Sequence, residues 1–261
     1  MIAVKTLRFA VAGLAVLLTA SLAACGGKTD NSAGSAATPS KGGAVIVFAA
    51  ASLTESFTTL GKQFESANPG STVTFNFGGS SALATQINEG APADVFASAS
   101  PKNMQVVTDA GTPTTFVKNQ LVIAVSKGNT KGITGLADLT KADLKVALCA
   151  ETVPCGAAAK TAIEAAGVKV TPVTLEQDVK AALSKVKLGE VDAALVYRTD
   201  AKASATDVDA VEFPESAKAI NDYPITVLKS AENAAGGQAF VDYVLSAEGT
   251  KVLTEAGFQA P

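Results

Sequence analysis

The chain has 261 residues and a formal charge of −3 at pH 7, with no histidine and no tryptophan. The missing histidine excludes Ser-His and Cys-His nucleophiles and histidine-ligated metals, and with them most hydrolase designs. The acidic balance and the lack of a basic stripe argue against nucleic acid as a partner.

The first 24 residues have the pattern of a secretory signal peptide. Lys5 and Arg8 precede an apolar run, Phe9 to Ala24, of 16 residues, shorter than the roughly 20 that a membrane-spanning helix needs. Cys25 follows Leu-Ala-Ala, which resembles the bacterial lipobox, whose cysteine is lipidated. We therefore expect an exported lipoprotein anchored to the outer face of the cell membrane through Cys25. The alternative is an uncleaved anchor with an incidental cysteine.

Residues 25–43 are predicted to be the lipidated cysteine and a flexible tether. After Cys25 this segment has no large apolar residue and consists mainly of Gly, Ser, Ala and Thr. A flexible coil of that length reaches roughly 20 to 25 Å, enough to hold a globular body close to a membrane. Without Lys5 and Arg8 the chain keeps 19 basic residues against 24 acidic ones, so the exported form is more acidic than the whole chain.

Two further cysteines, Cys149 and Cys155, lie six positions apart. Outside the cytoplasm such a pair can form a disulfide, but loop geometry decides this, and the sequence leaves the question open. We expect no metal cation site, because two thiols without histidine do not complete a zinc shell.

From Ala44 onward, short apolar runs alternate with segments that carry apolar residues at helical spacing, which predicts an α/β protein with largely parallel sheets. The predicted strands are residues 45–48, 72–77, 94–97, 121–125, 145–148, 193–197, 208–213 and 225–228. The predicted helices are residues 53–67, 81–88, 102–110, 157–166, 179–188 and 231–256. This length fits either one large sheet or two lobes joined by crossing strands with a ligand between them.

The first predicted strand leads directly into a possible anion site. Ser52 followed by Glu55 forms a Ser-x-x-Glu capping box, which predicts that a helix starts at Ser52. The first N–H groups of a helix have no partner within it and attract anions. The alternative interpretation is a capped helix that binds nothing.

Any anion site in this chain must use neutral donors. After the signal peptide the only arginine is Arg198, next to Tyr197 at a predicted strand end, and it cannot serve as a general anion clamp. Hydroxyl and backbone N–H donors suit a fully deprotonated oxyanion, whose oxygens all accept. The pair Ser184 and Lys187 has serine-lysine spacing, but we interpret Lys187 as a solvated charge on a helix rather than as a catalytic base.

Six short motifs together resemble the molybdate-binding proteins of bacterial ABC transporters, the ModA family, from Ala44 to the C-terminus. They are Phe-Ala-Ala-Ala-Ser-Leu-Thr at 48–54, Phe-Gly-Gly-Ser-Ser-Ala-Leu at 77–83, Gly-Ala-Pro-Ala-Asp-Val-Phe at 90–96, Val-Pro-Cys-Gly at 153–156, Gln-Asp-Val at 177–179 and Leu-Val-Tyr at 195–197. The resemblance implies a two-lobed periplasmic-binding-protein type II fold with the ligand cleft between lobes joined by crossing strands. We expect lobe 1 to comprise residues 44–122 plus 223–261, and lobe 2 residues 123–222.

The resemblance also implies a set of ligand-binding residues around an oxyanion held without cations. Hydroxyl and backbone donors would come from Ser52 and Ser80, backbone N–H groups from Cys155 and Val179, and a phenolic hydroxyl from Tyr197. By its own sequence context Ser80 is an ordinary helix N-cap flanked by close-packing glycines. Asp94 and Pro92 are interpreted as structural, a turn before a strand.

Two features depart from the implied pattern. The family commonly has alanine where this chain has Cys155, which matters little if the donor is a backbone N–H group. Thr174 and Gln177 fit a second capping box, and a helix starting there would already use the N–H group of Val179.

The expected function is therefore capture of molybdate, and of tungstate, without catalysis and without a cofactor. The protein, expected to be a monomer, would deliver the anion to an ABC permease served by a cytoplasmic ATPase. Three alternatives remain: a receptor for sulfate or phosphate on the same fold, a lipid-anchored enzyme with a serine nucleophile, and an interaction lipoprotein without a ligand.

Overall fold

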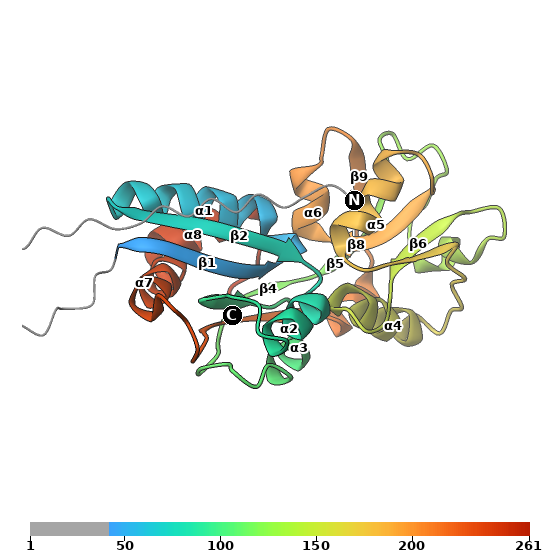
Figure 1. Cartoon of the computed structure of the whole chain (residues 1–261). Coiled ribbons are helices and arrows are strands. Elements are labelled where there is room, and N and C mark those ends of the chain that lie inside the picture. Colours follow the sequence, from blue (N-terminus) through green and yellow to red (C-terminus); the bar gives the residue numbers. More distant parts are fainter. Residues whose placement is uncertain (1–41) are drawn as a thin grey trace, which may run out of the picture. The chain divides into compact units, whose positions relative to one another are not determined.

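The computed structural model describes residues 42–261 (Figure 1). The predicted signal peptide, Cys25 and most of the predicted tether lie outside the described residues, so these stay predictions. Within residues 42–261, every helix is too short or too polar to cross a membrane.

The strands form two five-stranded sheets. The first sheet has the order β2-β1-β3-β10-β4 and the second the order β7-β6-β8-β5-β9. The first contains β1 (Gly43–Ala50), β2 (Ser71–Gly78), β3 (Val95–Ala97), β4 (Thr114–Asn119) and β10 (Asn221–Val227). The second contains β5 (Leu121–Ser126), β6 (Val146–Cys149), β7 (Thr174–Glu176), β8 (Ala193–Tyr197) and β9 (Val208–Val211). In each sheet three strands pair in parallel and the other two antiparallel to their neighbours.

The chain passes twice between the two sheets. Only Gln120 separates β4 of the first sheet from β5 of the second, and the chain returns between β9 and β10. Asn119 and Asn221, at the two crossings, are paired in the first sheet. The second sheet is thus an insertion between β4 and β10, which confirms the two-lobed α/β fold. We call the first sheet with its helices lobe 1 and the second lobe 2; the residue bounds given to the lobes above stay a prediction.

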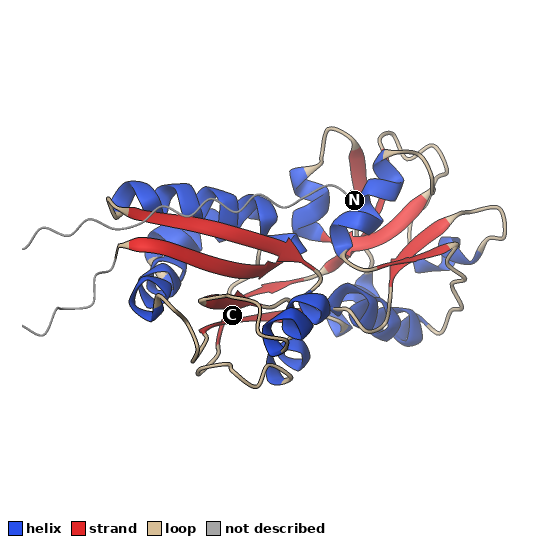
Figure 2. Ribbon diagram, viewed as in Figure 1, coloured by secondary structure: helices blue, strands red, loops and turns tan. Residues whose placement is uncertain are grey.

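The helices flank both sheets (Figure 2). Lobe 1 has the 3-10 helix η1 (Ala51–Leu53) and helices α1 (Thr54–Ala67), α2 (Ser80–Asn88), α3 (Pro101–Gln105), α7 (Ala234–Leu245) and α8 (Ala247–Ala256). Lobe 2 has α4 (Pro154–Ala166), α5 (Val179–Lys187), α6 (Arg198–Ala203) and the 3-10 helices η2 (Leu136–Thr140) and η3 (Pro214–Lys218).

The apolar run of β1 is continuous because the strand is buried on both faces. Val45 and Val47 pack with Phe57 of α1 and Phe240 of α7, whereas Phe48 packs with residues of α2 and α3 in a separate cluster. Successive side chains of a strand point to opposite faces, so a strand covered on both faces is apolar throughout. Burial on both faces holds β1 firmly within lobe 1. Its carboxyl end leads into η1, where Ala51 packs with residues of lobe 2.

Each predicted strand is present, with ends shifted by a few residues, and the structure adds two strands and a helix. The predictions missed β4, β7 and the short α6. The predicted helix 231–256 is two helices, because the Ser246 hydroxyl accepts from Gly249 N at 3.2 Å and caps α8. The predicted helix 102–110 ends at Gln105.

Candidate functional site

A small cavity lies between the lobes, at the ends of the strands that lead into their helices. Its volume, taken as the space open to the centre of a water-sized sphere, is about 20 Å³. The lining includes all five residues predicted to bind the ligand: Ser52, Ser80, Cys155, Val179 and Tyr197. No lysine or arginine is among the described residues that line it. The structure therefore brings together donors from both lobes, while their role as ligands stays a prediction.

The two lobes approach each other closely beside the cavity. Gly79 of lobe 1 lies against Gln177 of lobe 2, so that a Cβ atom on Gly79 would stand 2.3 Å from the Gln177 carbonyl oxygen. Real Cβ atoms do not come so close to a backbone oxygen. Only glycine fits here while the lobes are in this arrangement.

Ser52 does not cap a helix, so the capping-box prediction is wrong. Ser52 lies within η1, the 3-10 turn that precedes α1, and α1 starts at Thr54 without a side-chain cap. The buried Ser52 hydroxyl instead lies 2.8 Å from the Tyr223 hydroxyl of β10. The cause is the single 3-10 turn between strand and helix, which shifts the helix start past Ser52.

Ser80 is the first residue of α2 rather than its N-cap, which is Gly79, so that local prediction is also wrong. The buried Ser80 hydroxyl accepts a hydrogen bond from Ala99 N at 3.0 Å. A serine hydroxyl that accepts from the protein keeps its own proton for another acceptor.

Cys155 and Val179 both lie at helix starts in lobe 2. Cys155 is the second residue of α4 and Val179 the first residue of α5, so their N–H groups have no acceptor within their own helices. Asp178 caps α5 by accepting from Ala181 N at 2.9 Å. Thr174 begins the strand β7, so the second capping box is not formed and the conflict over the Val179 N–H group disappears.

Cys149 and Cys155 form a disulfide with 5.7 Å between their Cα atoms. It joins the end of β6 to the first turn of α4. The backbone that carries the Cys155 N–H group is thereby cross-linked to the second sheet.

Tyr197, the last residue of β8, supplies the only phenol among the described residues that line the cavity. Its hydroxyl is buried and has no hydrogen-bond partner within the described part of the chain. Burial, with the nearby Tyr223 phenol, raises the pKa of Tyr197 well above its ordinary value. The group therefore stays protonated and can donate to an acceptor placed in the cavity.

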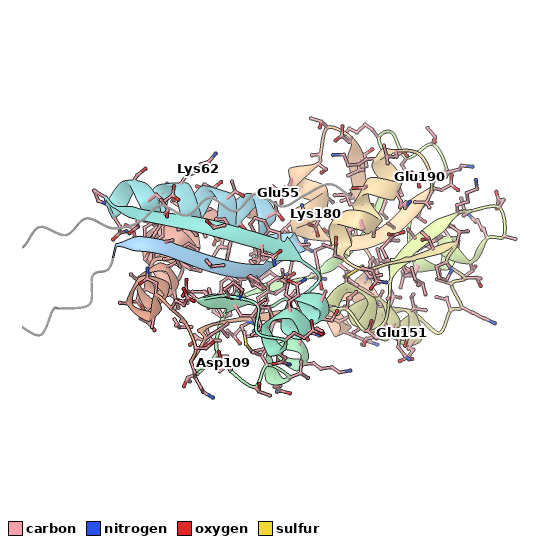
Figure 3. The ribbon with its side chains drawn as sticks, viewed as in Figure 1. Glu55, Lys62, Asp109, Glu151, Lys180 and Glu190 are labelled. Atoms are coloured by element: carbon pink, nitrogen blue, oxygen red, sulfur yellow. A yellow bond between two sulfur atoms is a disulfide. The ribbon has the colours of Figure 1, made fainter. Side chains whose placement is uncertain are left out.

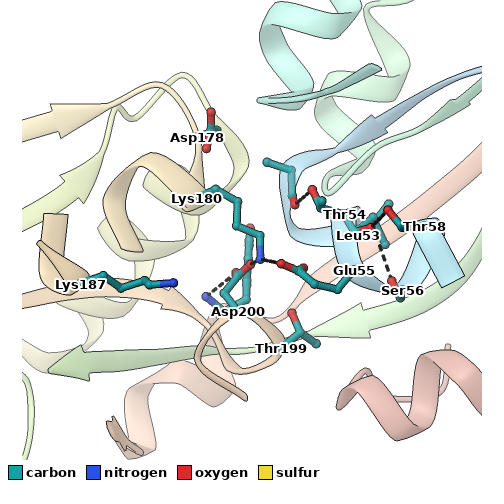
Figure 4. Close-up of polar contacts among 12 residues, drawn as sticks. Leu53, Thr54, Glu55, Ser56, Thr58, Asp178, Lys180, Lys187, Thr199 and Asp200 are labelled. Atoms are coloured by element: carbon teal, nitrogen blue, oxygen red, sulfur yellow. Dashed lines mark hydrogen bonds and ion pairs between the residues drawn. The ribbon is translucent and has the colours of Figure 1, made fainter. Parts of the chain in front are cut away.

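The cations that lie nearest to the site are committed elsewhere. Arg198 makes a bidentate pair with Glu212 at 2.9 and 2.8 Å. Lys180 of α5 contacts Glu55 of α1 at 2.7 Å and the buried Asp200 of α6 at 3.1 Å (Figure 4). Figure 3 shows Glu55 and Lys180 side by side where the lobes meet. Lys180 thus joins carboxylates of both lobes instead of lining the cavity.

Two other predictions about side chains hold. Asp94 is structural: its carboxylate accepts from Ile46 N and from Asn233 N, both at 2.8 Å. Lys187 pairs with Asp207 at 2.9 Å on the surface, as expected of a solvated charge.

No local sequence motif predicted the contacts of Asn119 and Tyr223. Asn119 Nδ2 donates to Thr199 Oγ1 at 2.8 Å and lies 3.5 Å from the Tyr223 hydroxyl. These contacts join β4, β10 and α6, so they depend on the strand crossing and the register rather than on a local motif.

Taken together, the two sheets, the double crossing and the donor-lined cavity define a two-lobed α/β binding protein with its candidate site between the lobes. More specifically, the chain belongs to the bacterial extracellular solute-binding protein family, whose model matches residues 45–259.

The relatives that the chain resembles include molybdate-binding proteins. The chain is 44% identical over 253 residues to the molybdate-binding protein ModA of Mycobacterium tuberculosis, covering 95% of this chain and 96% of that protein. It is 33% identical to ModA of Haemophilus influenzae, covering 83% and 90%.

Solved structures agree on the fold. The substrate-binding domain of a putative molybdenum ABC transporter from Clostridium difficile is 28% identical, with a TM-score of 0.62, covering 84% of this chain and 99% of that one. The periplasmic molybdate-binding protein of Azotobacter vinelandii has a TM-score of 0.72 at 20% identity, covering 83% and 99%, and shows the fold alone.

Proposed function

We propose that this protein captures molybdate, and also tungstate, outside the cytoplasm and delivers it to an ABC permease. The observation that carries the proposal is the donor set of the cavity. Hydroxyl and N–H groups from both lobes meet there, and no described lysine or arginine lines it. The 44% identity to a molybdate-binding protein supports the same ligand.

Binding energy would come from hydrogen bonds to a charged ligand. Each such bond contributes roughly 1.5 to 3 kcal/mol, and the five residues can offer several of them at once. Because the donors lie on two lobes, the anion binds the closed arrangement better than an open one and so stabilises closure.

We propose that the protein has no catalytic activity and needs no cofactor. The serines of the cavity face Tyr223 and Ala99 N rather than a general base, and the chain has no histidine to act as one. A fluorophosphonate probe should leave the protein unlabelled, and labelling at Ser52 or Ser80 would support the serine-enzyme alternative.

The competing ligands are other tetrahedral oxyanions. The sulfate-binding protein SubI of Mycobacterium tuberculosis shares this fold, with a TM-score of 0.69 at 17% identity, so the fold alone does not choose the anion. Calorimetric titration with molybdate, tungstate, sulfate and phosphate decides the matter. Molybdate and tungstate should bind tightest. Tighter binding of sulfate or phosphate would overturn the assignment, and no binding or thermal stabilisation by any of the four would favour an interaction lipoprotein.

Membrane anchoring and partners belong to the same proposal. Lipidation of Cys25 would hold a monomeric binding protein near the membrane, within reach of a permease driven by a cytoplasmic ATPase. A Cys25→Ala variant should lose labelling by a fatty-acid analogue and leave the membrane fraction. Retention of both in the variant would contradict the anchor.

A further inference from the structure

Both serine hydroxyls of the cavity are hydrogen-bonded to groups of the protein, and the direction of each bond decides what the serine offers a ligand. The bond at Ser80 has a fixed direction, since a backbone N–H group donates to it. At Ser52 the partner is the Tyr223 hydroxyl, and either oxygen could be the donor. The direction at Ser52 follows from the next contacts in the network.

The amide of Asn119 determines this direction. Asn119 Oδ1 accepts from the backbone N–H of Gln120 at 3.0 Å, which fixes which end of the amide is oxygen. The other end, Nδ2, donates to Thr199 Oγ1 at 2.8 Å and faces the Tyr223 hydroxyl at 3.5 Å. An amide NH₂ group has no acceptor capacity, so it cannot take the Tyr223 proton.

The Tyr197 hydroxyl lies near the Tyr223 hydroxyl, but it makes no hydrogen bond within the described residues. The Tyr223 proton therefore has one hydrogen-bonded acceptor in the described network, the Ser52 hydroxyl oxygen. Tyr223 is fully buried, and a buried hydroxyl that fails to donate costs free energy. Tyr223 donates to Ser52, and Ser52 keeps its own proton for the cavity, as Ser80 does.

We propose that Tyr223 is a positioning residue that makes Ser52 a hydrogen-bond donor and so fits the site to fully deprotonated oxyanions. The inference rests on the proposed function, because it assumes that molybdate occupies this cavity. A fully deprotonated anion can accept the protons of both serines. An anion that carries a proton, such as hydrogen phosphate, also needs an acceptor, and each serine oxygen already uses one of its two lone pairs for a bond within the protein. Asn119 supports Tyr223 from the strand crossing, so the same network joins the site to the connection between the lobes.

A double-mutant cycle of Tyr223→Phe and Ser52→Ala tests the proposal. Phenylalanine keeps the ring, which packs against Phe116, Tyr197 and Phe258, and removes only the hydroxyl. Molybdate affinity is measured by calorimetry for the wild type, both single variants and the double variant. Tyr243→Phe is the matched control, since Tyr243 is a half-buried tyrosine whose hydroxyl reaches Gln63 and which does not line the cavity.

We expect Tyr223→Phe to weaken molybdate binding roughly tenfold, the size of one hydrogen bond to a charged ligand. In the Ser52→Ala background the same change should weaken binding less than twofold, because Tyr223 acts through Ser52. Tyr223→Phe should also bring the phosphate affinity closer to the molybdate affinity. Without the bond from Tyr223, the Ser52 oxygen is free to accept the proton of hydrogen phosphate.

An equal loss in both backgrounds, or no loss in the single variant, would overturn the proposal. A wild type that does not bind molybdate in the same titration would instead refute the proposed function. Thermal unfolding of each variant without ligand verifies that the chains compared are folded.

Discussion

The two walls of the cavity present their donors in different ways. Lobe 1 offers the hydroxyls of Ser52 and Ser80, and the direction of each is set by a group that donates to it. Lobe 2 offers mainly the N–H groups of Cys155 and Val179, whose positions follow from where two helices begin. Donors of the first kind depend on side-chain identity, and donors of the second kind on the backbone path.

The largest effect on binding should come from a substitution that keeps the two lobes apart. Gly79→Ala places a Cβ atom against the Gln177 carbonyl oxygen, so the closed arrangement becomes unfavourable. The apparent affinity is proportional to the fraction of the protein that is closed, so we expect the molybdate affinity to fall about a hundredfold or more. Calorimetry measures it, with Gly135→Ala as the control because nothing lies within 4 Å of its added Cβ. Wild-type affinity in Gly79→Ala would show that the lobes do not need this approach.

The second largest effect should come from removing a side-chain donor of lobe 1, which can be compared with a side-chain change in lobe 2 that leaves the backbone donor in place. Ser52→Ala removes a donor and should weaken molybdate binding roughly ten- to hundredfold, whereas Val179→Ala keeps the backbone N–H and should change it less than about threefold. Both affinities are measured by calorimetry. Ser52→Ala also removes the acceptor of Tyr223, so unfolding without ligand is measured alongside. Equal losses in the two variants would contradict the distinction between the walls.

A smaller effect is expected from the disulfide that holds the second wall. Replacing Cys149 and Cys155 by alanine keeps both N–H groups, so molybdate affinity should fall only a few-fold. The free energy of unfolding should fall by about 2 kcal/mol, the loop-closure contribution of so short a loop. Urea unfolding and calorimetry measure the two quantities. A loss of binding as large as that of Ser52→Ala would mean that the backbone path needs the cross-link.

The last prediction concerns stability rather than binding, at Asp200, whose carboxylate supports the backbone of Tyr197. Its carboxylate accepts from Tyr197 N at 3.2 Å, and burial raises its pKa to about 6 although Lys180 opposes the shift. Between pH 4 and 6 the folded state therefore binds more protons at this group than the unfolded chain. Its contribution to stability is greatest at the acid end of that range and declines as the pH rises to 6.

Comparison with Asp200→Asn isolates this dependence from other carboxylates. The free energy of unfolding of the wild type should fall by about 2 kcal/mol relative to the variant as the pH rises from 4 to 6. Urea unfolding at several pH values measures the difference. A difference that does not depend on pH would show that Asp200 titrates normally.

The alternating α/β pattern could be predicted for a physical reason, whereas the five cavity residues could be predicted only from a resemblance. Strands such as β1 and β8 are buried on both faces, so their apolar runs are visible in the sequence alone. The cavity residues were found only through motifs shared with a family. Local capping rules gave the wrong role for Ser52 and Ser80, because their hydroxyls bond to Tyr223 and to Ala99 N from distant parts of the chain.

Contacts between distant segments could not be predicted from local patterns. The Asn119–Tyr223–Ser52 network needs the crossing at Gln120 and the register of β10 against β4. The contact of Lys180 with Glu55 needs the two lobes to meet. Neither leaves a spacing signal, because the partners are more than 100 residues apart along the chain.

A crystal structure of the protein with molybdate would show directly which groups hold the anion. We expect the anion in the cavity, with its oxygens accepting from the hydroxyls of Ser52, Ser80 and Tyr197 and from the N–H groups of Cys155 and Val179. Molybdate bound outside this cavity, or held there by Lys180 or Arg198, would contradict it.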